Sequence, residues 1–139
     1  MTQPGNIAFI GFGEAAMAFV RGWRKAGNPP AAMQITAYDL KTAHDDPVVR
    51  QSKLDDYASL AVDGTKSLQA ALKDTDVIFS LVTADQAAAA AATVSEYLEQ
   101  GSLYLDCNSC APGTKRRSAA RIEAAGGRYV DVAVMAPAT

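Results

Sequence analysis

Histidine and cysteine are scarce in this sequence, and their scarcity excludes several kinds of site. His44 is the only histidine, so no Ser/His/Asp arrangement can be assembled around a nearby base. Cys107 and Cys110 are the only cysteines, too few for a disulfide scaffold. A structural zinc needs about four ligands, and His44 lies far along the chain from both cysteines. We therefore expect no metal site and no nucleophilic triad.

Long apolar runs, a charge surplus and a leader segment are also missing. No apolar run approaches about 18 residues, the length that spans a bilayer. The opening residues, MTQPGN, lack the basic and apolar regions of a secretory signal. A formal net charge of −2 gives no general attraction to nucleic acid or to anionic membranes. These absences indicate a cytoplasmic protein with neither membrane nor nucleic-acid partners.

What is present is an alternation of strand-like and helix-like segments. Short apolar runs predict strands at residues 7–10, 34–38, 61–62, 77–82, 102–105 and 128–134. Helical patterns lie between them. The first follows residue 16, runs through Phe19, Val20 and Trp23 and closes at Gly27, and the others lie at residues 47–60, 67–73, 85–98 and 112–125. The predicted strands are continuous apolar runs, and helices separate them. This pattern predicts a parallel sheet with helices covering both faces. We therefore expect an α/β fold with a doubly wound Rossmann sheet of about six strands, in the order 3-2-1-4-5-6.

Local signals support the predicted helices. Asp46 is placed as a cap before the helix at 47–60, and Pro112 suits the first turn of the last helix. Gly27 is a C-cap candidate for the first helix, followed by a loop at residues 28–30. Residues 87–92 are six consecutive alanines, which predict a helix lying close against a neighbour.

The first strand runs directly into a glycine-rich turn that matches G-x-G-x-x-A. Gly11 permits the tight turn, Gly13 lets a pyrophosphate approach the backbone, and Ala16 lets helix and strand pack closely. The following helix offers unpaired N–H groups and a positive dipole to phosphates. The alternative is an ordinary strand-turn-helix. We interpret residues 1–139 as a dinucleotide-binding domain whose first cofactor-binding residues are Gly11, Phe12, Gly13, Glu14, Ala15 and Ala16.

Asp39 follows the second predicted strand, roughly 20 residues after the glycine turn, the place where dinucleotide folds carry an acidic residue. There it can accept hydrogen bonds from the adenosine ribose and repel a 2′-phosphate, which favours NAD. The alternative is a helix cap or a solvated turn carboxylate. Lys41 could instead pair with a 2′-phosphate, so NADP remains possible.

The predicted fourth strand ends in Leu81, Val82 and Thr83, where the nicotinamide ribose would lie. Backbone groups can make those contacts, and Thr83 is equally suited to starting a helix. The loops at residues 11–16, 39–41, 82–86 and 106–112 all follow strands, so they should open on one edge of the sheet.

Cys107 and Cys110 form a C-x-x-C motif after a strand. A redox dithiol or half of a zinc site are the sharper interpretations. With a single remote histidine and no further cysteine, small loop thiols without such chemistry are favoured.

Three stretches together resemble the N-terminal domain of the β-hydroxyacid dehydrogenases, the family of 3-hydroxyisobutyrate dehydrogenase, tartronate semialdehyde reductase and 6-phosphogluconate dehydrogenase. Residues 7–27 resemble the family's opening, with Ala15-Ala16 in place of the usual Met-Gly pair. Residues 104–112 resemble the substrate loop D-x-S-T-x-x-P, in which Asp106 and Pro112 match. Residues 127–137 resemble the following strand, in which Asp131 matches and Met135 replaces a frequent substrate-binding serine.

The resemblance implies an oxidoreductase that transfers a hydride between NAD(P) and a small hydroxy acid. It places Ser109 and Asn108 in the substrate loop, at the positions of the family's threonine and serine. It also implies a catalytic lysine in a second, all-helical domain beyond Thr139, and a homodimer formed through that domain.

The C-terminal residues 134–139 follow a strand-like run without a terminal helix, which suggests a cut at a domain edge. Two alternatives stay open, an NAD(H)-sensing module without catalysis and a redox-active C-x-x-C protein. A downstream helical domain bearing a lysine would favour the enzyme over the sensing module.

Overall fold

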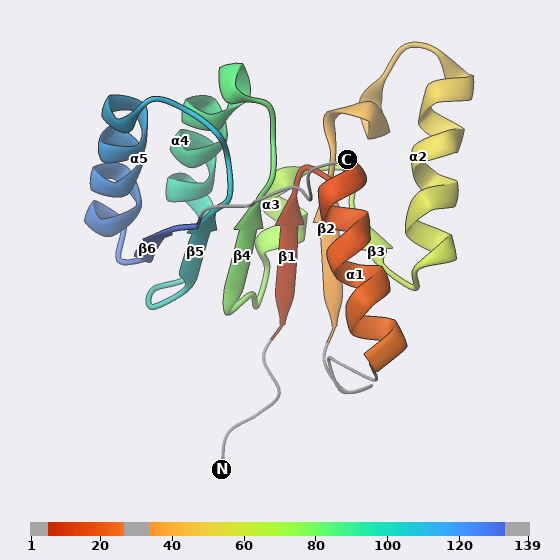
Figure 1. Cartoon of the computed structure of the whole chain (residues 1–139), viewed down its shortest axis with the longest axis horizontal. Coiled ribbons are helices and arrows are strands. Elements are labelled where there is room, and N and C mark those ends of the chain that lie inside the picture. The colour runs from red at the N-terminus through yellow and green to blue at the C-terminus, as the bar shows by residue number, and fades with distance from the viewer. Residues whose placement is uncertain (1–5, 27–33, 133–139) are drawn as a thin grey trace, which may run out of the picture.

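A six-stranded parallel sheet forms the centre of the molecule (Figure 1). In this computed structural model, which describes residues 6–26 and 34–132, the strand order is β3-β2-β1-β4-β5-β6. Strand β1 (Ile7–Ile10) lies between β2 (Ile35–Tyr38) and β4 (Val77–Ser80) and pairs with both in parallel. The predicted α/β class and strand order are therefore confirmed. The remaining elements are α1 (Glu14–Ala26), η1 (Leu40–Ala43), α2 (Pro47–Ser59), β3 (Asp63–Gly64), α3 (Leu68–Leu72), η2 (Ala84–Gln86), α4 (Ala87–Tyr97), β5 (Leu103–Asp106), α5 (Pro112–Ala124) and β6 (Arg128–Asp131).

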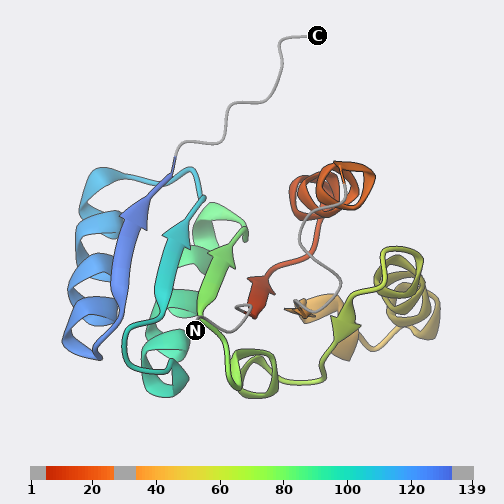
Figure 2. The ribbon, with the colours of Figure 1, turned by 90° about the horizontal axis from the view of Figure 1, so that it is seen from below.

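Two helical layers bury the two faces of the sheet in separate apolar cores. One core joins β1 and β2 to α1 and α2 through residues such as Phe9, Val20 and Tyr57. The other joins β1, β4 and β5 to α3, α4 and α5. Figure 2 shows α1 and α3 on opposite sides of the sheet. Within the described ranges, no helix has both the length and the apolar character to cross a bilayer.

The sequence signals for helix ends act as expected. Asp46 Oδ1 accepts from the Val48 N–H at 2.9 Å and caps α2. Pro112 opens α5. The alanine run forms the first part of α4, and its Ala91 side chain is fully buried, so the helix packs closely against its neighbours. Gly27 and the loop at 28–30 lie outside the described residues.

The predicted third strand at residues 61–62 is wrong. Ala61 adopts a left-handed backbone with φ of 55°, and Val62 N–H bonds back to the Tyr57 carbonyl at 3.0 Å, so both residues complete the turn that ends α2. The strand begins only at Asp63 and Gly64 and pairs there with β2. The side chain of Val62 packs in the core, so its apolar character does not indicate that its backbone pairs in a strand.

Several other predicted boundaries shift by one or two residues. Strand β4 ends at Ser80 instead of residue 82, and β5 is moved one residue toward the C-terminus. The predicted helix at 85–98 divides into the short 3-10 helix η2 and α4. Strand β6 ends at Asp131, so Val132 is not part of the strand as predicted, and residues 133–134 lie outside the described residues.

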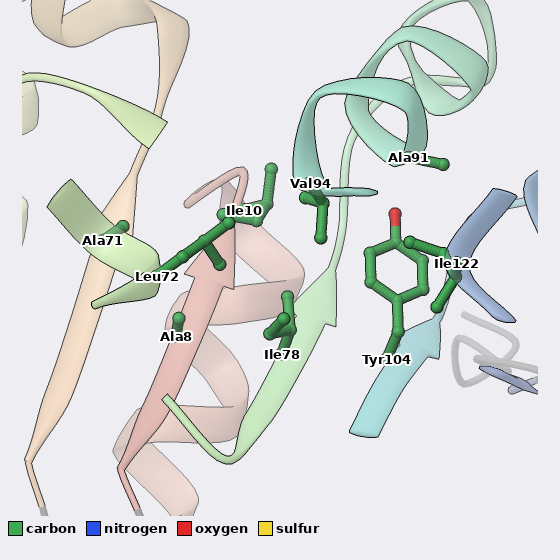
Figure 3. Packing of buried hydrophobic residues seen from close by; sticks show 9 residues of the cluster. All are labelled: Ala8, Ile10, Ala71, Leu72, Ile78, Ala91, Val94, Tyr104 and Ile122. Atoms are coloured by element: carbon green, nitrogen blue, oxygen red, sulfur yellow. The ribbon is translucent and has the colours of Figure 1, made fainter. Parts of the chain in front are cut away.

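Tyr104 places a hydroxyl group in the apolar core beneath α4 and α5. Its ring stacks on Tyr129 at a centroid distance of 5.9 Å, and its hydroxyl points toward α4 between Val94 and Ala91 (Figure 3). Among the described residues this hydroxyl is buried without a hydrogen-bond partner. In the opposite core, by contrast, the Tyr57 hydroxyl lies 2.9 Å from Thr42 Oγ1.

The two tyrosines therefore make a matched pair for a stability test. Tyr104→Phe removes an unsatisfied hydroxyl and should raise the free energy of unfolding by about 1 kcal/mol, whereas Tyr57→Phe breaks a hydrogen bond and should lower it by about 1 kcal/mol. Urea unfolding followed by circular dichroism measures both. If Tyr104→Phe destabilised the chain as much as Tyr57→Phe, the Tyr104 hydroxyl would have to be making a compensating contact.

Candidate functional site

A cleft of about 760 Å³ opens where the strands end. The carboxyl ends of the strands form the upper edge of the sheet in Figure 1. Its volume falls within the range of small-molecule and cofactor sites. It lies between β1 and β4, where the strand order reverses. It is lined by Ile10, Gly11, Gly13, Glu14, Ala15, Ala16, Tyr38, Asp39, Leu40, Lys41, Leu68, Leu81, Val82, Thr83, Gln86, Ala89, Ala90, Thr93, Cys107, Asn108 and Ser109. All four predicted loops therefore contribute to one cleft.

The two glycines of the turn are required for different reasons. Gly11 has φ of +88°, and a Cβ added there would lie 2.2 Å from the Leu81 carbonyl oxygen. Any side chain at Gly11 would therefore force β1 and β4 apart. A Cβ at Gly13 would have no neighbour within 4 Å, so the space beside Gly13 is open cleft.

Helix α1 begins at the floor of this cleft. The Met17 N–H donates to the Gly13 carbonyl at 3.0 Å, so the N–H groups of Glu14, Ala15 and Ala16 precede the first intrahelical bond. Ala16 is fully buried and brings the helix close to the sheet. Free N–H groups and the positive end of the helix dipole together suit a phosphate.

Phe12 is the one predicted residue of this loop whose side chain lies outside the cleft. The ring is fully buried and packs 5.1 Å from the Tyr57 ring and 6.0 Å from the Phe9 ring. Phe12 can therefore act on a cofactor only through its backbone.

Asp39 lines the cleft and also caps a helix, so the two interpretations of this residue are compatible. Its Oδ1 accepts from the Lys41 N–H at 2.9 Å and starts η1, while its Oδ2 accepts from the Phe12 N–H at 2.7 Å. An ionised carboxylate has about four lone-pair sites, so acceptor capacity remains for a ribose. Lys41 is exposed and lines the same end of the cleft.

The segment from Leu81 to Thr83 runs past the end of β4 along the cleft. Leu81 N–H bonds to the Ile10 carbonyl at 2.8 Å, which ties it to β1. Thr83 precedes η2 but makes no side-chain cap bond. This segment therefore forms the part of the cleft wall that lies beside the glycine turn.

Asn108 is buried, and its side-chain amide holds the substrate-loop candidate against β4. Its Oδ1 accepts from the Val82 N–H at 2.7 Å, and its Nδ2 donates to Ser80 Oγ at 3.0 Å and to Asp106 Oδ1 at 2.9 Å. Neighbouring Ser109 is exposed at the cleft. The two residues thus differ, because Ser109 is exposed where it lines the cleft, while the buried Asn108 side chain bridges two loops.

Asp106 is a buried carboxylate below this loop, with three donors around it. It accepts from the Asn108 backbone N–H, from Asn108 Nδ2, and from the Tyr129 hydroxyl at 2.5 Å. Burial, followed by the hydrogen bond to Asp106 and its charge, raises the pKa of Tyr129 well above its usual value. Tyr129 therefore stays protonated and continues to donate.

Lys115 closes the outer side of this network. Its Nζ lies 3.5 Å from the Asp106 carbonyl oxygen and donates to Asp131 Oδ1. Partial burial lowers the pKa of Lys115. The hydrogen bond that Lys115 donates to Asp131 and the negative charges of Asp106 and Asp131 raise it by more, so the pKa is above its usual value. Lys115 is therefore a fixed cation.

The C-x-x-C motif lacks the properties of a redox centre. Burial and the nearby Asp106 charge raise the pKa of Cys107 to about 11, and the same two causes raise the pKa of Cys110. A reactive dithiol needs a lowered pKa. Within the described ranges, no cluster of three or more His, Cys, Asp or Glu side chains could hold a metal ion. The raised thiol pKa values argue against redox chemistry, and the interpretation of both cysteines as small loop thiols stays a prediction.

Two residues near the site were missed at the level of sequence, Lys53 and Tyr129. Lys53 is buried on α2, four residues before Tyr57. Its place on the same stripe as Val49 and Tyr57 was a readable signal, because a lysine on the inner face of a helix needs a partner. No comparable signal marked Tyr129, because its role depends on the pairing of β5 with β6.

Solved structures with this fold are similar over nearly the whole chain. A conserved hypothetical protein from Sinorhizobium meliloti 1021 is 32% identical, with a TM-score of 0.85 over 98% of this chain and 43% of that one. A conserved protein of unknown function, described as similar to 3-hydroxyacid dehydrogenases, is 26% identical, with a TM-score of 0.73 over 95% of this chain and 44% of its own.

A more distant structure shares the fold. The 3-hydroxyisobutyrate dehydrogenase of Mycobacterium tuberculosis, solved with L-serine, is 18% identical, with a TM-score of 0.77 over 96% of this chain and 42% of that one. The present chain thus spans less than half the length of these three proteins. No curated protein sequence matches it.

The family assignment rests on the sequence as a whole. Residues 6–136 match the family described as the NAD-binding domain of 6-phosphogluconate dehydrogenase. The match takes in the glycine turn, the Asp39 turn and the loop after β5, which are the elements that form the cleft. The chain belongs to this family of oxidoreductase NAD-binding domains, and NAD is its cofactor.

Proposed function

We propose that the chain is the cofactor-binding domain of an NAD-dependent dehydrogenase or reductase that acts on a small hydroxy acid, as 3-hydroxyisobutyrate dehydrogenase does. One observation carries the proposal. The cleft joins a phosphate-binding turn at one end to an exposed serine, Ser109, in the loop after β5. A cofactor lying along this cleft would bring its nicotinamide toward Ser109.

The substrate class rests on the relatives and on Ser109. One similar structure is a 3-hydroxyisobutyrate dehydrogenase with L-serine, which is itself a 3-hydroxy acid, and another is described as similar to 3-hydroxyacid dehydrogenases. Ser109 would hydrogen-bond the carboxylate or hydroxyl of such a molecule. Asn108, whose amide holds the loop to β4, would add a substrate contact of its own or fix the place of Ser109.

The bound cofactor supplies or accepts the hydride. The chain's own residues orient it, through the free N–H groups of α1 and the backbone of the segment from Leu81 to Thr83. A proton must also move to or from the substrate hydroxyl. Among the described residues that line the cleft, Lys41 is the only basic side chain, and it lies at the Asp39 end. We therefore propose that a lysine of a following helical domain supplies the proton, and that this domain forms a homodimer.

The first test separates an enzyme domain from an NAD(H)-sensing module. Calorimetry should show that the chain binds NADH, and steady-state assays should show no turnover of 3-hydroxyisobutyrate. With NAD present, NMR titration with 3-hydroxyisobutyrate should move the Ser109 amide resonance, and Ser109→Ala should weaken that binding while the Ser95→Ala control does not. A chain that binds NADH but ignores the hydroxy acid would favour the sensing module, and steady turnover would contradict the assignment of the proton donor.

The second test addresses the pyrophosphate site at Gly13. Gly13→Val should abolish NADH binding without lowering the melting temperature, because the new side chain occupies open cleft and meets no protein atom within 4 Å at its Cβ. Gly22→Val is the matched control, since Gly22 is exposed on α1 and also has open space beside it. Unchanged NADH affinity in a folded Gly13→Val chain would mean that the turn is only structural.

The third test concerns the choice between NAD and NADP. A hydrogen bond to the Asp39 carboxylate should contribute roughly 1.5–3 kcal/mol, and the exposed Lys41 should contribute less because solvent screens it. We therefore expect NAD to bind more tightly than NADP. In Asp39→Ala, the difference in affinity between the two cofactors should be smaller. Asp39→Ala also frees the Phe12 N–H, but that loss affects both cofactors equally.

The ratio of the NAD and NADP dissociation constants therefore isolates the effect at the 2′ position. It should be measured for wild type, Asp39→Ala and Lys41→Ala in one buffer, since salt screens the lysine. Tighter NADP binding by wild type that disappears in Lys41→Ala would show that Lys41 governs this end of the cleft.

A further inference from the structure

Lys53 is a buried lysine beneath the glycine turn, on the face of α2 that packs toward α1 and β1. It is 5% exposed, and its Nζ donates to the Phe12 carbonyl oxygen. The same Nζ lies 5.8 Å from the centre of the Phe12 ring and 3.2 Å from Asp56 Oδ2. Burying an ammonium group costs free energy unless it is well paired. One of the contacts of Lys53 must therefore offset the cost of its burial.

The ion pair with Asp56 offsets little of the cost of burying Lys53. Asp56 is one turn further along α2, and its side chain is 31% exposed, so solvent weakens the pair. The buried partner of Lys53 is the Phe12 carbonyl, which belongs to the turn between the two glycines. The lysine therefore acts mainly on the backbone of that turn.

Two opposite charges hold the backbone of Phe12. Its N–H donates to Asp39 Oδ2 at 2.7 Å, and its carbonyl accepts from Lys53. Since a peptide unit is planar and trans, the N–H of Gly13 points away from the Phe12 carbonyl. With that carbonyl held toward α2, the Gly13 N–H faces away from α2, and Gly13 lines the cleft.

We propose that Lys53 is a positioning residue that aims the Gly13 N–H at the pyrophosphate of the cofactor. The inference rests on the cofactor site described under the proposed function and adds a residue that never touches the ligand. Lys53 sets the orientation of one peptide, and its buried positive charge favours an anion on the other side of that peptide.

The decisive comparison uses ligands with and without a pyrophosphate. In Lys53→Met, which keeps an apolar stem of similar length, ADP and NADH should bind roughly 10-fold more weakly, the size expected for one lost hydrogen bond to a charged group. Adenosine, titrated by NMR, should bind as it does to wild type. The Gly13 amide resonance of the ligand-free chain should also move, because its peptide has lost its donor.

Two controls isolate the contact with Phe12. Asp56→Asn removes the surface ion pair but keeps Lys53, and it should leave ADP affinity unchanged. Lys73→Met removes an exposed lysine outside the cleft and should behave in the same way. If Lys53→Met does not fold, Lys53→Leu also removes the donor to the Phe12 carbonyl, and the same comparison of ADP with adenosine applies to it.

The outcomes separate this inference from the proposed function. Wild type that fails to bind NADH or ADP overturns both. Wild type that binds ADP while the folded lysine variant binds it equally well, or loses ADP and adenosine affinity by the same factor, overturns only the role of Lys53. Selective loss of ADP and NADH binding, together with a moved Gly13 resonance, supports it.

Discussion

The close approach of β1 and β4 at Gly11 is the constraint on which the site depends. A Cβ at Gly11 would lie 2.2 Å from the Leu81 carbonyl oxygen, so only glycine lets the two strands end side by side. The Gly11 N–H bonds to the Tyr38 carbonyl on β2, and the Leu81 N–H bonds to the Ile10 carbonyl, both at 2.8 Å. One residue without a side chain thus brings together the ends of three strands, and the cleft forms between the loops that leave them. A bulkier residue here would widen the sheet before it affected any ligand.

The loop after β5 depends in turn on this arrangement. Asn108 reaches across from the end of β5 and accepts from the Val82 N–H, so the loop that carries Ser109 is attached to the segment proposed to hold the nicotinamide ribose. Both ends of its side-chain amide are hydrogen-bonded. The oxygen accepts from Val82, and the nitrogen donates to Ser80 and to Asp106. The segment from Leu81 to Thr83 and the loop after β5 are therefore joined by one side chain, so a shift of either would change the distance between Ser109 and the proposed nicotinamide site.

The parts of this structure that could be predicted from sequence are those set by local patterns. Apolar runs alternating with helices determine the sheet order, and the Gly11–Ala16 turn and the Asp46 cap are read directly from residue types. The features that the sequence did not predict depend on contacts between segments that are distant along the chain. β3 was misplaced because Val62 is apolar for its side chain alone, while Asp63 and Gly64 pair only because β2 lies beside them. The contact of Lys53 with Phe12 spans 41 positions, and no local pattern reports which carbonyl a buried lysine will reach.

Asp106 links the loop that carries Ser109 to the last described strand. This carboxylate is 1% exposed, and one of its three donors is the hydroxyl of Tyr129 on β6. A buried carboxylate that lost this donor would be left with one oxygen unpaired, which costs free energy. Strand β6 contributes no residue to the lining of the cleft, yet its tyrosine completes the hydrogen bonds beneath the loop after β5. A substitution at the edge of the sheet can therefore change the cleft without touching it.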